Sequence, residues 1–202
     1  MTRLNRSSLD IVFVHDPDDF LDEALHETIP TLEQMKAEGV IKAIGVGMNT
    51  TSGLAYLLDR CDLDCILVAG RYTLLDQSAA TDLFPTCRDR GVGIVLGGVF
   101  NSGVLTGAVG GYANYNYRAA EREILERVEG IEAVCREFAV PLRAAAVAFA
   151  VDACSVDSVL VGCRNVSEVE DTLSLFQYSV PSEMWAKLIR LGLIADVSDL
   201  YG

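Results

Sequence analysis

The sequence lacks what several large classes of protein require. It has only two histidines and one tryptophan among 202 residues, and no apolar run approaches the ~18 residues of a membrane-spanning helix. Basic residues are also scarce, with 16 Lys and Arg against 29 Asp and Glu, which gives a net charge of −13. Such a surface repels phosphate backbones and anionic lipid. We therefore expect neither nucleic acid nor a membrane among the partners.

Several diagnostic motifs are also missing. There is no CxxC pair, no GxxxxGK[ST] phosphate loop, no GxSxG nucleophile elbow and no GxGxxG after the first strand. The first apolar segment, Leu9–Val14, is too short for a secretion signal. We interpret the six cysteines as reduced thiols of a cytoplasmic protein. They are Cys61, Cys65, Cys87, Cys135, Cys154 and Cys163.

What is present indicates one globular domain over residues 1–202. Half of the residues are hydrophobic and the mean hydropathy is +0.29, so a chain of this length can bury a substantial core.

The apolar segments alternate between short strand-like runs and longer helical patterns. Short, nearly all-apolar runs are typical of parallel strands that are buried on both faces. Helical patterns are expected at 18–38 (interrupted near Thr28 by Pro30), 51–60, 78–90, 118–138, 141–153, 165–176 and 181–194. The predicted strands are Leu9–His15, Ile41–Val46, Cys65–Ala69, Val92–Leu96 and Ser158–Val161. This order predicts an α/β fold with about five parallel strands, which fits either part of a (β/α)₈ barrel or a doubly wound sheet.

Polar residues follow the first strand, where barrels carry their functional groups. His15 closes this strand, so its imidazole can polarise a carbonyl or bind a substrate oxygen. Asp16, Asp18 and Asp19 could join it as metal ligands, although such aspartates more often cap helices.

Glycines follow the last two predicted strands. Gly97–Gly103 and Gly162–Arg164 let backbone N–H groups approach a phosphate, and Arg164 adds a guanidinium. The tyrosines Tyr112, Tyr115 and Tyr117 could cover a ligand or pack on the next helix. These loops predict a phosphate-bearing ligand.

Five segments in order together resemble strands four to eight of the aldo-keto reductases. Within that family, the pattern is similar to the branch of bacterial D-threo-aldose 1-dehydrogenases, also called L-fucose dehydrogenases. The segments are Leu9–Asp16, Gly39–Gly47, Arg71–Asp76, Gly91–Val95 with Ser102–Gly107, and Val159–Asn165 with Glu168–Asp171.

The resemblance implies an incomplete (β/α)₈ TIM barrel that uses NADP or NAD. It implies hydride transfer with an aldose or another small carbonyl or alcohol substrate, and it makes His15 the catalytic histidine that orients substrate. Arg164 could meet a 2′-phosphate, whereas Glu168 would favour a free ribose hydroxyl. The implied cofactor-binding residues are Asn49, Gly97, Gly98, Val99, Phe100, Asn101, Ser102, Gly103, Gly162, Arg164 and Glu168.

The sequence also departs from the family pattern. Asn49 is shifted from the usual Ser-Asn pair, Ala69 stands where a glutamine is common, and Gly97 stands where an aromatic residue often stacks on nicotinamide. The family's catalytic aspartate, tyrosine and lysine belong to segments before its fourth strand. We therefore expect an N-terminally truncated oxidoreductase that is inactive alone, with open sheet edges that self-associate or bind a missing N-terminal segment.

Two other functions stay open at this point. One is a non-catalytic half-barrel that binds nucleotide or a partner chain. The other is a metal-dependent hydrolase barrel that uses His15 and Asp16.

Overall fold

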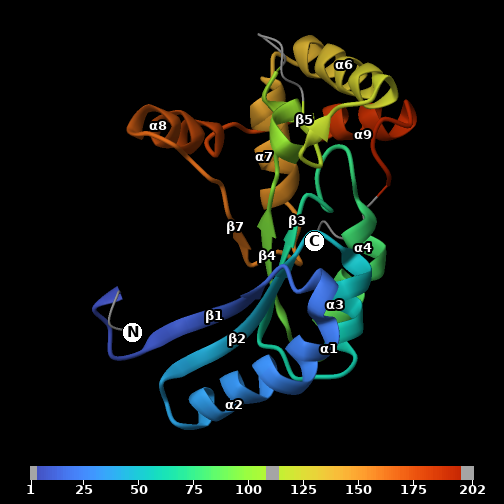
Figure 1. Cartoon of the computed structure of the whole chain (residues 1–202). Coiled ribbons are helices and arrows are strands. Elements are labelled where there is room, and N and C mark those ends of the chain that lie inside the picture. The colour runs from blue at the N-terminus through green and yellow to red at the C-terminus, as the bar shows by residue number, and fades with distance from the viewer. Residues whose placement is uncertain (1–3, 108–113, 197–202) are drawn as a thin grey trace.

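The computed structural model describes residues 4–107 and 114–196, and its centre is a five-stranded parallel sheet. The strands follow one another across the sheet in the order β1-β2-β3-β4-β7 (Figure 1). A doubly wound sheet reverses its strand order at a switch point, whereas a barrel does not. The fold is therefore the barrel type. The strands are β1 (Leu9–His15), β2 (Ile41–Met48), β3 (Cys65–Ala69), β4 (Gly93–Gly97) and β7 (Ser158–Val159).

The two faces of the sheet differ in burial. One face carries the core under the helices, and Val46, Ile66 and Val68 have no exposed surface there. On the other face Phe13 pairs in register with Gly45, which pairs with Cys65. Strand β1 forms one edge of the sheet, and its Ile11 is 47% exposed. The prediction that this first strand is buried on both faces is thus wrong.

The helices cover the buried face and differ in detail from the predicted spans. They are η2 (Asp18–Phe20), α1 (Leu21–Glu23), η3 (Ala24–Thr28), α2 (Ile29–Ala37), α3 (Thr51–Leu58), α4 (Ser78–Asp82), α5 (Phe84–Arg90), η4 (Asn101–Thr106), α6 (Arg122–Glu137), α7 (Leu142–Val151), α8 (Val166–Leu175) and α9 (Ser182–Arg190).

Prolines mark two breaks in the helices, of which the one near Thr28 agrees with the prediction. Pro30 lies at the start of α2, directly after the π-helical turn η3, and Pro85 lies at the start of α5. A proline is tolerated in the first turn of a helix because its missing N–H has no intrahelical partner to lose. The predicted helix at 78–90 is therefore two helices. Gly91 then ends α5 in the left-handed conformation, with a φ of +67°.

A small hairpin precedes α6. Strands β5 (Asn114–Tyr115) and β6 (Arg118–Ala119) pair antiparallel, so the predicted helix at 118–138 begins only at Arg122. Asn116 and Tyr117 form the turn with positive φ values of 48° and 63°. Tyr112 lies outside the described residues.

Two aspartates tie neighbouring strands together where the strands begin. Asp64 precedes β3 and accepts the N–H of Ile44 in β2 at 2.7 Å. Asp157 precedes β7 and accepts the N–H of Ile94 in β4, also at 2.7 Å. Each carboxylate thus satisfies a backbone donor of the adjacent strand.

The sheet is open at β1 and β7, and helix α8 projects to one side of α7 (Figure 1). The fifth strand is shorter than the predicted run to Val161. Helix α8 carries an exposed apolar stripe of Val166, Val169 and Leu173, which are 73%, 44% and 60% exposed. The expected incomplete barrel is therefore confirmed.

Within residues 4–107 and 114–196, no helix combines the length and apolarity of a membrane span.

Candidate functional site

The predicted site residues gather where the parallel strands end. His15 ends β1, and its side chain is 84% exposed, with Nε2 3.8 Å from the carboxylate of Asp16. The Asp16 N–H donates to the Gly47 carbonyl at 2.8 Å, so the chain after His15 stays beside β2. His15 therefore lies at the open edge of the sheet with room for a ligand.

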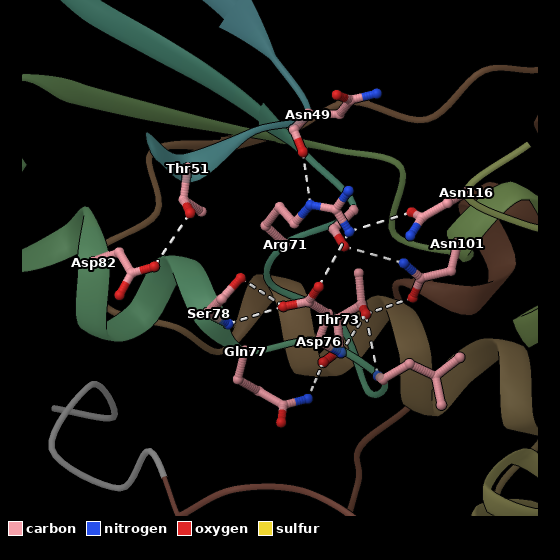
Figure 2. Close-up of polar contacts among 12 residues, drawn as sticks. Asn49, Thr51, Arg71, Thr73, Asp76, Gln77, Ser78, Asp82, Asn101 and Asn116 are labelled. Carbon is pink, nitrogen blue, oxygen red and sulfur yellow. Dashed lines mark hydrogen bonds and ion pairs between the residues drawn. The ribbon is translucent and has the colours of Figure 1, made fainter. Parts of the chain in front are cut away.

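Arg71 connects three loops at this end of the sheet (Figure 2). Its Nε donates to the backbone carbonyl of Asn49 at 2.6 Å, and its Nη1 donates to Asp76 at 3.1 Å and to Asn116 at 3.2 Å. The Arg71 and Asp76 side chains are each only 19% exposed. This half-buried ion pair fixes the Asn49 loop, the loop after β3 and the β5–β6 hairpin relative to one another.

Thr73 and Asn101 form a second, fully buried connection. The Thr73 hydroxyl donates to Asn101 Oδ1 at 2.5 Å and accepts the N–H groups of Leu75 and Asp76. Asn101 Nδ2 donates to the Gly70 carbonyl at 3.1 Å. With Asn101 only 3% exposed, its side chain holds the loop after β4 against the loop after β3. Sequence reasoning placed Asn101 at the cofactor, and the structure uses its amide group inside the protein.

The loop after β4 contains several residues in the left-handed region of backbone conformation. Gly98, Ser102 and Gly103 have positive φ values of 64°, 60° and 105°. An added Cβ at Gly98 would meet the Gly70 nitrogen at 2.9 Å, so this close approach requires glycine. Ser102 Oγ accepts the N–H of Tyr117 at 3.1 Å, which brings the hairpin tip to the loop. Gly98, Ser102 and Tyr117, together with Asn49, line a cavity of about 150 Å³.

A second cavity, of about 360 Å³, lies between this loop and the start of α8. Arg164 lies at its rim, where the side chain is 90% exposed, and donates from Nε and Nη2 to Glu168 Oε1 at 2.9 and 2.7 Å. The hydrogen bonds from Arg164 hold the pKa of the Glu168 carboxyl below its ordinary value. Asn165 caps α8 by accepting the Glu168 N–H at 2.9 Å. The lining residues are Phe100, Thr106, Arg143, Gly162, Arg164, Glu168, Asp171 and Thr172.

The residues around this cavity fit the phosphates of a dinucleotide. A Cβ at Gly103 or at Gly162 would meet nothing within 4 Å, so the backbone there is open to a ligand. Arg143 Nε is a buried donor without an acceptor among the described residues. The Arg143 side chain lines the cavity, so its guanidinium could pair with an entering phosphate if it turns toward the open space.

Of the remaining predicted cofactor residues, Gly97 and Val99 are buried, the latter at 2% exposure, and Phe100 faces the larger of these two cavities. Sequence reasoning did not identify Arg71 or Arg143. One feature of the sequence could have pointed to Arg143 as a site residue: it is the only charged residue in the apolar helix Leu142–Val151.

A hollow of about 700 Å³ lies elsewhere, on the helix side of the sheet, and contains none of the predicted site residues. Its lining includes Leu25, His26, Tyr56, Arg60, Cys61 and Arg90. In the described part of the chain, no three His, Cys, Asp or Glu side chains are grouped to hold a metal ion. All six cysteines are free thiols.

Comparison with known proteins agrees with this architecture. The model of the aldo/keto reductase family matches residues 1–192. A D-threo-aldose 1-dehydrogenase from Pseudomonas sp is 39% identical over 194 residues, which are 95% of this chain and 59% of that protein. A pyridoxal 4-dehydrogenase from Microbacterium luteolum is 35% identical over 203 residues, covering 96% of this chain and 59% of the relative.

Among solved structures, the holo form of an aldo-keto reductase from Bacillus halodurans superposes with a TM-score of 0.69 at 23% identity. The match covers 96% of this chain and 63% of that one. This likeness shows the shared fold. The chain thus spans about three fifths of the length of these relatives.

Proposed function

The chain belongs to the aldo/keto reductase family, and we propose on that basis that it forms the nicotinamide-dinucleotide-binding part of an oxidoreductase. The observation that carries this proposal is the cavity between the loop after β4 and α8, where open glycine backbone and two arginines face one space. The proposed substrate is an aldose, such as L-fucose or D-arabinose, or another small carbonyl or alcohol. This choice follows the relative named D-threo-aldose 1-dehydrogenase.

The residues take different roles in this proposal. When bound, the nicotinamide would exchange a hydride with C1 of the sugar. His15, exposed at the end of β1, donates a hydrogen bond that orients the sugar oxygen. Asn49, held by Arg71, offers its amide to the carboxamide end of the cofactor. Within the predicted Gly97–Gly103 loop, Gly103 gives backbone room for the phosphates, as does Gly162.

Both NADP and NAD stay within the proposal. Glu168 can accept a ribose hydroxyl, as acidic residues do in NAD sites. An arginine of the same cavity can receive an additional phosphate. We also propose a cytoplasmic location, which the six free thiols support.

Titration calorimetry with NADP⁺ and NAD⁺ tests the binding part of this proposal. We expect at least one dinucleotide to bind the 202-residue chain, and failure of both would contradict the proposal. The same sample is then given an aldose panel, and the formation of reduced nicotinamide is followed by absorbance. Turnover would contradict the expectation that the chain is inactive alone, whereas binding without turnover fits both the dinucleotide-binding part of an oxidoreductase and the alternative of a non-catalytic half-barrel.

The open edges of the sheet support a proposal about partners. Strands β1 and β7 each have one neighbour, and α8 exposes its apolar stripe. We propose that these surfaces contact a second copy or a further segment of barrel. Light scattering over a range of protein concentrations tests self-association, and a constant monomer mass would exclude the second copy.

A further inference from the structure

The cavity beside α8 is lined by two arginines whose side chains differ in exposure and in hydrogen-bond partners. Arg164, which sequence reasoning identified, lies at the rim with its side chain 90% exposed. Its backbone N–H donates to Glu168 Oε2 at 2.8 Å, while its Nε and Nη2 donate to Oε1. An ion pair with a phosphate at so exposed a guanidinium is screened by water and adds little affinity.

Arg143 is placed differently. It projects from α7, with its side chain 31% exposed, and its Nη1 forms an ion pair with Asp171 of α8. Its guanidinium carbon lies 5.7 Å from the centre of the Phe100 ring. Its Nε is buried and has no acceptor among the described residues. An unpaired buried donor on a charged group costs free energy, which an incoming anion recovers.

The two arginines of the cavity are each paired with one carboxylate, so an anion at Arg143 competes with Asp171. Glu168 is neutralised by Arg164, and Asp171 is the carboxylate that an anion would displace from Arg143. The N-terminal end of α8 adds its partial positive charge on the same side, and Gly162 leaves space for the ligand.

We propose that Arg143, and not Arg164, supplies the guanidinium that binds a phosphate of the dinucleotide, with Asp171 as its competing partner. This inference rests on the proposed function. The shared chemistry is a phosphate group on the adenosine side, either the 2′-phosphate of NADP or the pyrophosphate common to NADP and NAD.

Titration calorimetry on the complete 202-residue chain tests the assignment, with NADP⁺, NAD⁺ and adenosine 2′-phosphate as probes. The variants are Arg143→Gln, Arg143→Lys, Asp171→Asn and Arg164→Gln. Arg136→Gln on α6 is the matched control, because its side chain is 69% exposed and belongs to neither cavity. Circular dichroism and thermal unfolding verify the fold of every variant. Arg143→Lys keeps the positive charge if Arg143→Gln proves unstable.

We expect Arg143→Gln to weaken the binding of NADP⁺ by roughly tenfold or more, and Asp171→Asn to strengthen it severalfold. A merely structural ion pair would give losses in both variants, so opposite signs identify a direct contact. Arg164→Gln and Arg136→Gln should stay within about threefold of the unmodified chain.

The probes identify which phosphate is bound. Losses confined to NADP⁺ and adenosine 2′-phosphate assign the 2′-phosphate, and equal losses for NADP⁺ and NAD⁺ assign the pyrophosphate. The inference is overturned if Arg143→Gln binds every probe like the unmodified chain, or if Arg164→Gln alone loses affinity. Binding of adenosine 2′-phosphate through Arg143 without binding of either dinucleotide would refute the proposed function, and with it the assignment of Arg143 to a dinucleotide phosphate. Failure of the unmodified chain to bind any probe would refute both.

Discussion

The guanidinium of Arg71 donates from Nε to the backbone carbonyl of Asn49 over 2.6 Å. This hydrogen bond joins the loop after β3 to the loop after β2, and the same guanidinium reaches Asp76 and Asn116. The position of Asn49 therefore depends on a side chain that is distant from it in sequence. Its amide is a candidate cofactor contact only while Arg71 holds the loop.

Replacing Arg71 by lysine tests this dependence. Lysine keeps the charge but cannot serve three acceptors from one planar group. We expect a loss of about 1–2 kcal/mol in the free energy of unfolding and weaker dinucleotide binding. Urea denaturation and calorimetry measure the two effects. Arg88→Lys, with a side chain that is 64% exposed on α5, is the control. Equal behaviour of the two variants would argue against the connecting role.

Thr73→Val removes the hydroxyl from the buried connection to Asn101. It leaves Asn101 Oδ1 without its donor and the N–H groups of Leu75 and Asp76 without their acceptor. We expect a destabilisation of about 2–4 kcal/mol, because buried unpaired polar groups are costly. Chemical denaturation of Thr73→Val and of the exposed control Thr81→Val gives the comparison. A loss no larger than that of the control would refute the role of this connection.

Gly45→Ala tests the packing on the open face of the sheet. A methyl group at Gly45 would overlap the Phe13 ring and lie 2.9 Å from Cys65 Sγ. We expect a destabilisation of about 1–3 kcal/mol, which the double variant with Phe13→Leu partly restores. Gly162→Ala should leave stability unchanged, since nothing lies within 4 Å of its added Cβ. Thermal unfolding measures all four proteins, and an unaffected Gly45→Ala would show that Phe13 is free to move.

Asp64 makes stability dependent on pH. Burial raises the pKa of its carboxyl, but the hydrogen bonds from Lys36 and the Ile44 N–H outweigh burial and hold the pKa below its ordinary value. The contribution is therefore present above the unfolded pKa, near 4, and is lost as the pH falls through the lowered folded value. With 36% of the side chain exposed, we expect about 1 kcal/mol or less.

Unfolding free energies measured from neutral to acidic pH test this expectation. Asp64→Asn should flatten the acid limb, whereas Asp89→Asn, exposed on α5, should not. An identical acid limb in Asp64→Asn would contradict the assignment.

The thiols should differ in reactivity. Burial raises the pKa of Cys87 and of Cys135 to about 11, whereas Cys154 is exposed. The thiolate is the reactive form, so a disulfide reagent at mildly alkaline pH should modify Cys154 first and reach the two buried thiols only on unfolding. Cys154→Ser should remove the fastest phase. If that phase persists, another thiol must be accessible.

The strands could be predicted because each is a short apolar run with a clear end. Cys65–Ala69 has the predicted bounds, and β4 is shifted by one residue. The burial of β1 could not be predicted in this way, because its composition resembles that of a central strand while its place in the sheet is an edge. Local pattern carries no information about which neighbours a strand receives.

The glycines after β4 predicted a loop of unusual backbone conformation, and Gly98 and Gly103 there have positive φ values. That this loop binds a phosphate stays a prediction, for which Gly103 leaves space. The sequence did not identify Arg143 as a site residue, because it is a single cation in an apolar helix. Only the packing of α7 against α8 brings it beside Asp171. Asn101 was predicted to contact the cofactor because it lies in the glycine-rich loop after β4. Its side chain instead turns inward and accepts a hydrogen bond from Thr73.

The aspartates that precede β3 and β7 help to fix the register of the strands. If β3 slid by one residue along β2, Asp64 would lose the Ile44 N–H, and sliding of β7 would likewise separate Asp157 from Ile94. Register slips are therefore penalised at one end by side chains as well as by the strand ladder. The loops at the opposite end can then vary in length and sequence, and the protein can thereby bind new substrates, while the register of the strands is preserved.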